Sequence, residues 1–179
     1  QIITKKKMNI ALIVSGALKN KKEATWITIT DLASEHIKKG HKVFICAQKN
    51  KRLPKIEKLD GFSVYRLFSN KYFKFLTGYR TVKEISKRLK INFDIIHGFS
   101  SNPIMILNTY LAGKALRDIK PKTIHTIKSY PLSKFQGKFF NKFSRLIDHL
   151  TTSTKLTSDK INKNSVSSNI KIIRSNINL

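Results

Sequence analysis

The pattern near the N-terminus narrows the possible folds of this chain more than any other feature, because it predicts a complete strand–helix–strand unit. Residues 8–15 and 41–47 are continuous apolar runs of strand length, and residues 23–39 between them place apolar side chains at helical spacing. Gly40 follows two lysines and ends the helix. Two strands joined through one helix pair in parallel, so this segment predicts a parallel sheet.

The same alternation continues to the C-terminus. Further strands are predicted at residues 61–68, 93–97, 123–128, 148–153 and 170–174, and further helices at residues 79–90, 103–119, 137–146 and 155–163. The polar residues 48–60 are interpreted as a connector. The sequence therefore predicts a single α/β domain: a doubly wound, mostly parallel, Rossmann-like sheet of about seven strands with helices on both faces.

Composition limits the function classes. The net charge of +26 indicates an anionic partner such as phospholipid, nucleic acid or a phosphorylated substrate, although only 7 of the 36 basic residues are arginine, which an AT-rich coding sequence also produces. The five histidines are dispersed and Cys46 is the single cysteine, so no metal site is expected. No Gly-x-Ser-x-Gly, Walker or Gly-x-Gly-x-x-Gly motif occurs, which argues against a hydrolase, a P-loop enzyme or a typical dehydrogenase.

Polar residues follow most of the predicted strands. Because the carboxyl ends of parallel strands meet at one edge of a sheet, these residues are expected to gather where ligands bind. They are Ser15, Gly16, His97, Gly98, Ser100, Ser101, Lys128, Ser129, Tyr130, Ser153 and Thr154. His97 has a side chain that can transfer protons near a substrate, and a structural histidine hydrogen-bonded to the backbone is an equal alternative.

Two basic, aromatic stretches are candidates for contact with an anionic membrane surface. Residues 71–79 are loop-like, whereas residues 134–150 place aromatic and apolar side chains at three- and four-residue spacing between cations. The residues expected at the membrane are Phe73, Phe75, Lys138, Phe139, Lys142 and Phe143. The alternative is that the aromatic side chains pack on the sheet while the cations face water.

Five segments in order resemble the N-terminal half of GT-B glycosyltransferases of the retaining, glycogen-synthase-like type, glycosyltransferase family four. The first is the opening unit with its Lys-Lys-Gly-His-Lys-Val sequence at residues 38–43. The others are Asp-Ile-Ile-His-Gly at 94–98, Lys-Thr-Ile-His-Thr-Ile-Lys at 122–128, Asp-His-Leu-Thr-Thr-Ser at 148–153 and Ile-Arg-Ser-Asn-Ile-Asn at 173–178. The resemblance covers nearly the whole chain.

This resemblance implies an acceptor-side domain at residues 8–179, preceded by an extension at residues 1–7 and ending at an interdomain hinge with Ser175 and Asn176. A nucleotide-sugar donor is expected to bind with a C-terminal domain or separate subunit, and no cofactor is expected to be bound tightly. The strand-end residues would then hold a saccharide or lipid-linked acceptor.

Two positions depart from the family pattern. Lys21 and Lys22 stand where the family usually has a glycine pair that lets a phosphate approach the backbone, although their side chains can still bind an anion. Lys128 stands where the family usually has a histidine. The resemblance implies His97 and Lys128 as catalytic residues, and Lys21 and Lys22 as substrate-binding residues.

The leading hypothesis is the acceptor-binding domain of a hexose-transferring enzyme of cell-envelope polysaccharide or glycolipid synthesis, inactive without its donor-binding half. It is expected in the cytoplasm, with peripheral contact to the inner face of the membrane. One alternative is a non-catalytic module of the same fold that recruits a partner to a membrane. A weaker alternative is nucleic-acid binding through the lysine excess.

Overall fold

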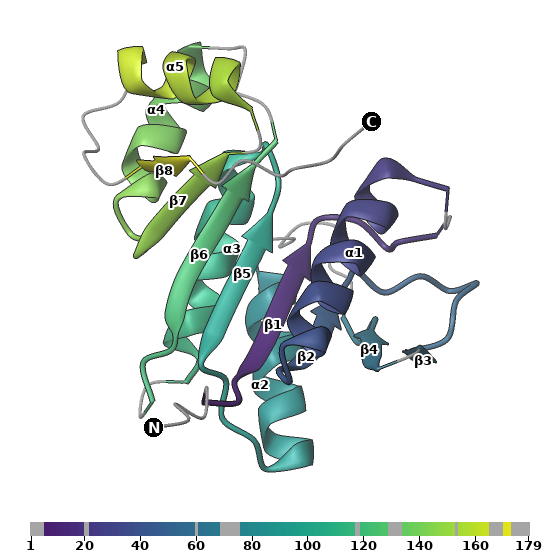
Figure 1. Cartoon of the computed structure of the whole chain (residues 1–179). Helices are drawn as coiled ribbons and strands as arrows, with labels where there is room; N and C mark the ends of the chain where they lie inside the picture. Colours follow the sequence, from purple (N-terminus) through teal and green to yellow (C-terminus); the bar gives the residue numbers. More distant parts are fainter. Residues whose placement is uncertain are drawn as a thin grey trace.

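The structure is a computed structural model of the whole chain (Figure 1). It describes residues 6–19, 22–59, 61–68, 76–116, 119–128, 134–152, 154–164 and 170–172.

One sheet runs through the molecule, with its strands in the spatial order β3-β4-β2-β1-β5-β6-β7-β8. The strands are β1 (Asn9–Val14), β2 (Lys42–Cys46), β3 (Ile56–Leu59), β4 (Phe62–Tyr65), β5 (Ile95–Phe99), β6 (Lys122–Ile127), β7 (His149–Thr152) and β8 (Ile170–Ile172). Neighbouring strands are parallel except β3, which pairs antiparallel with β4 at the edge. The predicted doubly wound, mostly parallel fold is confirmed.

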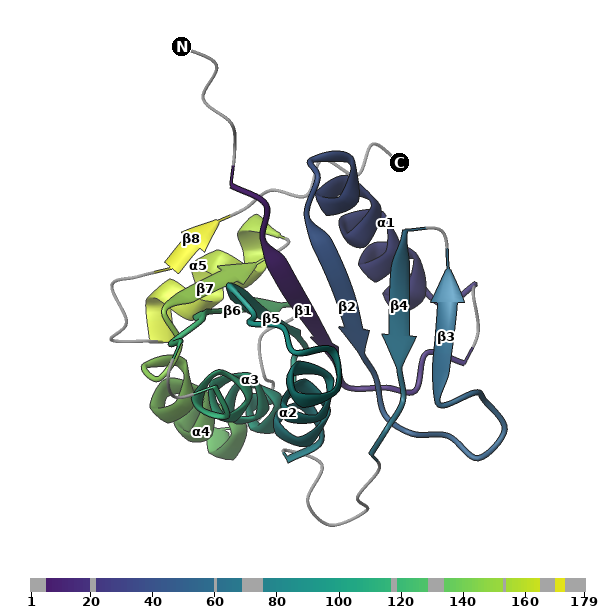
Figure 2. The ribbon, with the colours of Figure 1, turned by 90° about the horizontal axis from the view of Figure 1, so that it is seen from below.

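Helices cover both faces of this sheet (Figure 2). They are α1 (Ala24–Lys38), α2 (Thr77–Leu89), α3 (Pro103–Lys114), α4 (Lys134–Ser144) and α5 (Lys155–Asn164). Figure 2 shows α1 on one face and α2, α3 and α4 on the other. This division follows from right-handed crossovers, because the chain moves in one direction along the sheet through α1 and in the opposite direction through α2, α3 and α4.

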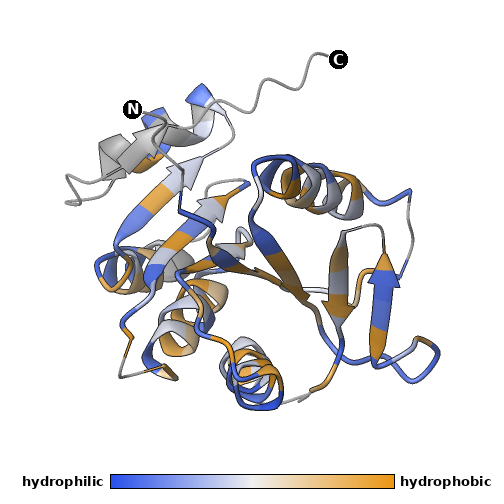
Figure 3. Cartoon of the chain, turned by 60° about the horizontal axis from the view of Figure 1, so that its bottom comes forward, coloured by the Kyte–Doolittle hydropathy of each residue, from blue (hydrophilic) through white to orange (hydrophobic). Residues whose placement is uncertain are grey.

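Strand β1 lies at the centre, and its continuous apolar sequence is explained by burial on both faces. Ile10 and Leu12 pack toward α1 in one core cluster that includes Ile29. Ala11 and Ile13 pack in a second cluster on the side of α2 and α3. Figure 3 shows apolar residues concentrated on the strands and on the sides of the helices that face them.

The predicted end of α1 before Gly40 is also confirmed. Gly40 has a φ of 83°, a left-handed conformation that favours glycine, and its backbone N–H donates to the Ile37 carbonyl at 2.8 Å. The chain then turns directly into β2, where Cys46 is buried within the sheet. Burial raises the pKa of its thiol, so Cys46 behaves as a small apolar side chain.

Three predicted elements are corrected by the structure. Residues 48–60 are more than a connector, since β3 lies within them at Ile56–Leu59. The strand predicted at 93–97 is β5 at Ile95–Phe99, so it ends two residues later than expected. The helix predicted at 103–119 ends at Lys114.

Candidate functional site

The order of the strands reverses direction between β1 and β5, and this is where ligands bind in open parallel sheets. The carboxyl end of β1 leads into Ser15 and Gly16, and the carboxyl end of β5 leads into Ser100 and Ser101. Val14 of β1 lies in register with Phe99 of β5, so the two turns leave the sheet at the same level. The predicted gathering of polar residues at one edge is therefore present for these four.

The β1–α1 loop is fixed by Arg66, which follows β4. Its guanidinium is buried, with Nε donating to the Ala17 carbonyl at 2.8 Å and Nη2 donating to the Leu18 carbonyl at 3.2 Å. Nη1 lies 2.8 Å from Oε2 of Glu57 in β3. Leu18 has a φ of 52°, a strained conformation for a residue other than glycine. One guanidinium thus holds a strained loop against the edge strand.

The β5–α3 turn is held by hydrogen bonds of its own. The Asn102 side chain caps α3 by accepting from the Ile104 N–H at 3.0 Å, and Pro103 occupies the first helical turn, where no N–H donor is needed. Ser100 Oγ accepts from the Asn102 N–H at 3.0 Å. The turn that carries the predicted Ser100 and Ser101 is therefore rigid.

A buried histidine supports this turn from below. His125 of β6 is fully buried, its Nε2 lies 3.2 Å from the Ser100 carbonyl, and its Nδ1 lies 2.9 Å from Thr109 Oγ1 of α3. A carbonyl only accepts, so Nε2 carries the proton, and Nδ1 shares the Thr109 hydroxyl proton with the Met105 carbonyl, which lies 3.0 Å from Thr109 Oγ1. Burial lowers the pKa of His125 to about 4. The ring is therefore neutral at pH 7 and positions the turn through two hydrogen bonds.

Because His125 is buried and neutral, we expect the fold to lose stability in acid. Because the pKa of His125 is lower in the folded chain than its ordinary 6.5, the unfolded chain binds more protons between these values, and stability is lost as pH falls from 6.5 to about 4. The loss attributable to this ring is about 3 kcal/mol, since each pKa unit corresponds to about 1.4 kcal/mol. Urea denaturation at pH 7, 5.5 and 4.5 measures it.

The matched variant is His125→Gln, which removes the titrating group and keeps a donor for the Ser100 carbonyl. Its stability should fall less steeply over the same pH range. Asp94 and Asp148 have pKa values below their ordinary 3.8, so their contributions are lost below this range. The pKa values of His97 and His36 are lowered as well, and both groups are present in both proteins, so the difference between the two slopes reports His125. An equal slope in both proteins would show that His125 is not the group responsible.

His97 lies inside β5, two residues before the strand ends. Its Nε2 is 2.7 Å from Thr126 Oγ1, which is in turn 2.6 Å from Thr151 Oγ1 of β7. Burial, followed by repulsion from His125 and His36, lowers the pKa of His97 to about 3. The side chain is thus a neutral member of a hydrogen-bonded row across three strands, and its catalytic role stays a prediction.

Lys128 connects the end of β6 to the start of α1. Its Nζ donates to Thr25 Oγ1 at 3.0 Å, although the two residues are 103 positions apart. The side chain is half-buried, and this burial lowers the pKa of the ammonium. Thr25 lies in the first turn of α1, so Lys128 places a partly desolvated cation beside a helix N-terminus.

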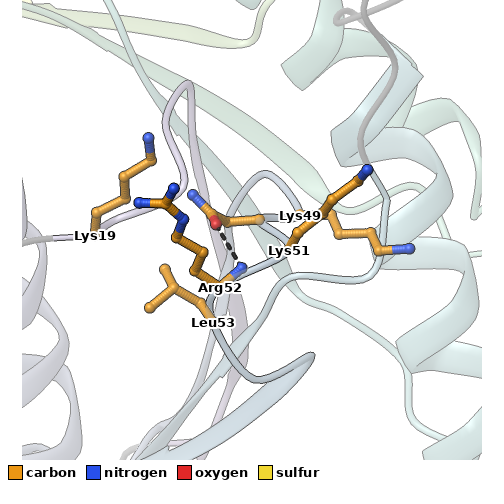
Figure 4. A pocket seen from close by; sticks show the side chains of 6 residues that line it. Lys19, Lys49, Lys51, Arg52 and Leu53 are labelled. Atoms are coloured by element: carbon orange, nitrogen blue, oxygen red, sulfur yellow. Dashed lines mark hydrogen bonds between the residues drawn. The ribbon is translucent and has the colours of Figure 1, made fainter.

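A cationic hollow of about 480 Å³ lies on the outer side of the β1–α1 loop (Figure 4). Lys19 from this loop lines it together with residues 49–53 from the loop after β2. The Gln48 N–H donates to the Gly16 carbonyl at 3.0 Å and ties the two loops together.

The remaining predicted site residues fall into two groups. Gly98, Lys22 and Thr154 are described: Gly98 lies buried inside β5, whereas Lys22 and Thr154 lie after β1 and β7 respectively. Lys21, Ser129, Tyr130, Ser153, Ser175 and Asn176 lie outside the described residues. Sequence reasoning missed Arg66, Thr25 and Asn102. Only Asn102 could have been recognised from the sequence, since Asn before Pro marks the start of a helix.

The residues expected at a membrane surface also include some that the structure does not describe. Phe73 and Phe75 lie outside the described residues. Among the α4 rings whose burial the structure describes, Phe140 is fully buried, Phe139 is 37% exposed and Phe143 is half-buried. The ring centroids of Phe139 and Phe143 are 5.6 Å apart. Lys138 and Lys142 are exposed beside them. Of the two, Phe143 packs against the core cluster that contains Phe140, and Phe139 is the more exposed ring.

Two kinds of feature are absent from the part of the chain that the structure describes. No group of three or more His, Cys, Asp or Glu side chains is placed there to hold a metal ion. No described helix is both long and apolar enough to cross a bilayer.

Comparison with known proteins places this fold in a family. A sequence model described as Glycosyltransferase Family 4 matches residues 26–179. Sucrose-phosphate synthase from Thermosynechococcus elongatus is 13% identical with a TM-score of 0.67, and the match covers 95% of this chain and 90% of that chain. No protein in the curated collection matches.

A second solved structure is the catalytic domain of starch synthase IV from Arabidopsis thaliana, bound to ADP and acarbose. It is 13% identical with a TM-score of 0.62, and the match covers 94% of this chain and 52% of that chain. This chain therefore spans about half of that catalytic domain, and the likeness at such identities is one of fold. The family match covers most of the chain and confirms the predicted resemblance, so this chain belongs to glycosyltransferase family 4 and has the fold of the N-terminal half of GT-B glycosyltransferases.

Proposed function

We propose that this chain is the acceptor-binding domain of a hexosyltransferase that uses a nucleotide-sugar donor and acts in cell-envelope polysaccharide or glycolipid synthesis. The acceptor binds at the edge formed by the turns after β1, β5 and β6. The observation that carries the proposal is the contact of Lys128 with Thr25, which brings the turn after β6 against the first turn of α1 beside the point where strand order reverses.

The electrostatics of this contact favour an anionic or strongly polar ligand. The N-terminus of a helix carries a partial positive charge, so a lysine ammonium placed beside it is unfavourable in an empty site. Burial adds a separate cost, because it disfavours the charged form and lowers the pKa of Lys128. A phosphate or a sugar hydroxyl bound between them would relieve this cost.

The donor would bind with a second domain that closes over this edge. The starch synthase domain that resembles this chain is described as bound to ADP, and this chain covers 52% of it. We therefore expect the chain alone to bind nucleotide-sugars weakly and to transfer little sugar.

The experiment is a transfer screen in which this chain is combined with the donor-binding domain or subunit proposed above. Radiolabelled UDP-, GDP- and ADP-hexoses are incubated with a lipid and polysaccharide extract, and label is measured in the extracted acceptor fraction. We expect transfer from one donor class and release of the matching nucleoside diphosphate. Absence of transfer from every donor, with a folded protein and intact donors, would refute the enzymatic proposal.

A second candidate function, contact with a membrane, is favoured by α4 and the residues after it. Phe139 is 37% exposed and Leu146 is 39% exposed, and Lys138, Lys142 and Arg145 are exposed around them. Insertion of apolar side chains between cations that face phospholipid headgroups is the arrangement of a membrane-surface helix.

The double variant Phe139→Ser, Leu146→Ser should bind anionic vesicles at least about tenfold more weakly, because each apolar side chain contributes about 1–2 kcal/mol on insertion. Co-sedimentation with phosphatidylglycerol vesicles measures it. The matched control is Ile27→Ser, Ile119→Ser, which removes two apolar side chains that are 48% and 40% exposed elsewhere. Equal loss in both variants would show that α4 is not the membrane contact, and unchanged binding in both would indicate attraction by charge alone. Tighter binding to duplex DNA than to vesicles would favour the nucleic-acid alternative.

A further inference from the structure

The cationic hollow beside the candidate site is built from two loops that are fixed relative to each other (Figure 4). Lys19 belongs to the β1–α1 loop, and Lys49, Lys51 and Arg52 belong to the loop between β2 and β3. All four cations are exposed, and no carboxylate is among the residues that line the hollow.

Hydrogen bonds donated by backbone N–H groups define the shape of the second loop. Asn50 Oδ1 accepts from the Arg52 N–H at 2.9 Å, and the Asn50 carbonyl accepts from the Leu53 N–H at 3.3 Å. The Lys49 N–H donates to the Phe68 carbonyl at 2.9 Å. This turn presents Lys51 and Arg52 at its tip, so the positions of their backbones do not depend on a ligand.

One side chain joins the β1–α1 loop to β3, the strand that follows the second loop. The guanidinium of Arg66 holds the Ala17 and Leu18 carbonyls on one side and the Glu57 carboxylate on the other. Glu57 is also the single acidic residue among residues 48–59, which contain five lysines and arginines. Its carboxylate is paired with Arg66, and Glu57 is not among the residues that line the hollow.

Four like charges around one hollow repel one another, and a bound anion removes this repulsion. A phosphate group suits the arrangement, since it carries up to two negative charges, and an arginine side chain can bind two of its oxygens at once while lysines act as point charges. A volume of about 480 Å³ accommodates a phosphate together with a sugar ring. The Gln48–Gly16 hydrogen bond places the hollow next to the turn after β1.

We propose that the hollow lined by Lys19, Lys49, Lys51 and Arg52 binds the phosphate group of a phosphate-bearing acceptor. The identity of the ligand as an acceptor rests on the proposed function, whereas the phosphate site does not. The same phosphate chemistry occurs in a soluble sugar phosphate and in a phospholipid headgroup.

The test measures binding without any donor or transfer. Calorimetry compares glucose 6-phosphate with glucose, and sedimentation compares phosphatidic acid vesicles with phosphatidylcholine vesicles. The variant is Lys49→Gln, Lys51→Gln, Arg52→Gln. The matched control is Lys39→Gln, Lys42→Gln, Lys87→Gln, which removes the same charge at exposed positions away from the hollow. Thermal midpoints of all three proteins should agree, because every substituted side chain is exposed.

We expect a phosphate compound to bind and its uncharged counterpart not to bind. The hollow variant should lose about tenfold in affinity, since three exposed charge contacts each contribute a factor of about two to five, and the control should stay within about twofold. Binding of glucose 6-phosphate identifies a soluble source, and binding to phosphatidic acid vesicles alone identifies a lipid source.

Equal losses in the hollow variant and the control would overturn the proposal, as would the failure of both phosphate sources to bind. Because no sugar transfer is measured, a negative result leaves the transferase proposal standing. Conversely, phosphate binding with no transfer in the labelled-sugar screen would support the phosphate site and argue against transferase activity.

Discussion

Gly98→Ala should destabilise the domain by about 3 kcal/mol or more, because the new methyl group has no space. A Cβ at this position would overlap Thr109 Oγ1 and lie 2.5 Å from His125 Nδ1. Both atoms belong to the buried hydrogen bonds that hold the Ser100 turn, so neither can move without breaking them. Urea denaturation at pH 7 measures the loss, and the thermal midpoint should fall by roughly 6–12 °C.

The matched control is Gly16→Ala, which adds the same methyl group where the nearest atom, the Leu18 backbone nitrogen, is 4.0 Å away. It should change stability by less than about 0.5 kcal/mol. Adding Thr109→Ala to Gly98→Ala makes room for the methyl group, so the double variant should lose less than the sum of the single losses. Equal stability of Gly98→Ala and Gly16→Ala would contradict the packing described around His125.

Arg66→Met should cost about 2–3 kcal/mol of stability. The substitution keeps the length of the buried side chain but removes a guanidinium whose loss leaves Glu57 without its partner. We place the loss at the lower end for a buried ion pair because the Glu57 side chain is 24% exposed. The Ala17 and Leu18 carbonyls also lose their donor, so the β1–α1 loop should become mobile, which faster amide hydrogen exchange in residues 15–19 would report.

Two comparisons separate this anchor from an ordinary ion pair. Adding Glu57→Gln to Arg66→Met should recover about 1 kcal/mol, because it removes the unpaired charge. Arg88→Met removes a cation from the exposed Glu84–Arg88 pair of α2 and should cost no more than about 0.5 kcal/mol. If Arg66→Met and Arg88→Met were equally mild, Arg66 would not be the anchor of the β1–α1 loop to β3.

The βαβ unit could be predicted from the sequence because the residues that indicate it lie within one short segment. Apolar runs buried on both faces and a helix closed by Gly40 require no knowledge of distant residues. Strand β3 was missed because an edge strand can be short and polar, and Ile56–Leu59 contains a glutamate and a lysine. The start of β5 was misplaced because Phe93 is fully buried yet precedes the strand, whose register is set by pairing with β1.

The parts of the site that could not be predicted depend on contacts between distant segments. A single arginine after a strand gives no indication that it is buried, since its partners at positions 17, 18 and 57 come from other elements. The Lys128–Thr25 contact joins the turn after β6 to α1 for the same reason. In α4, two adjacent phenylalanines leave the rotation of the helix undetermined, and packing in the cluster with Ile106 selects Phe140.

The central claim is that the acceptor binds at the edge where Lys128 meets Thr25. The most direct measurement is the KM for acceptor and, separately, for donor in Lys128→Met, using the donor and acceptor identified by the labelled-sugar screen. The control is Lys122→Met, at the opposite end of the same strand, where the side chain is 70% exposed. Urea denaturation must show that both variants are folded.

Lys128→Met should raise the acceptor KM at least about tenfold, because a charge-assisted contact to the bound ligand is lost. The donor KM should change less than about twofold. Lys122→Met should change neither constant. An acceptor KM that stays at the wild-type value in a folded Lys128→Met protein would contradict the account.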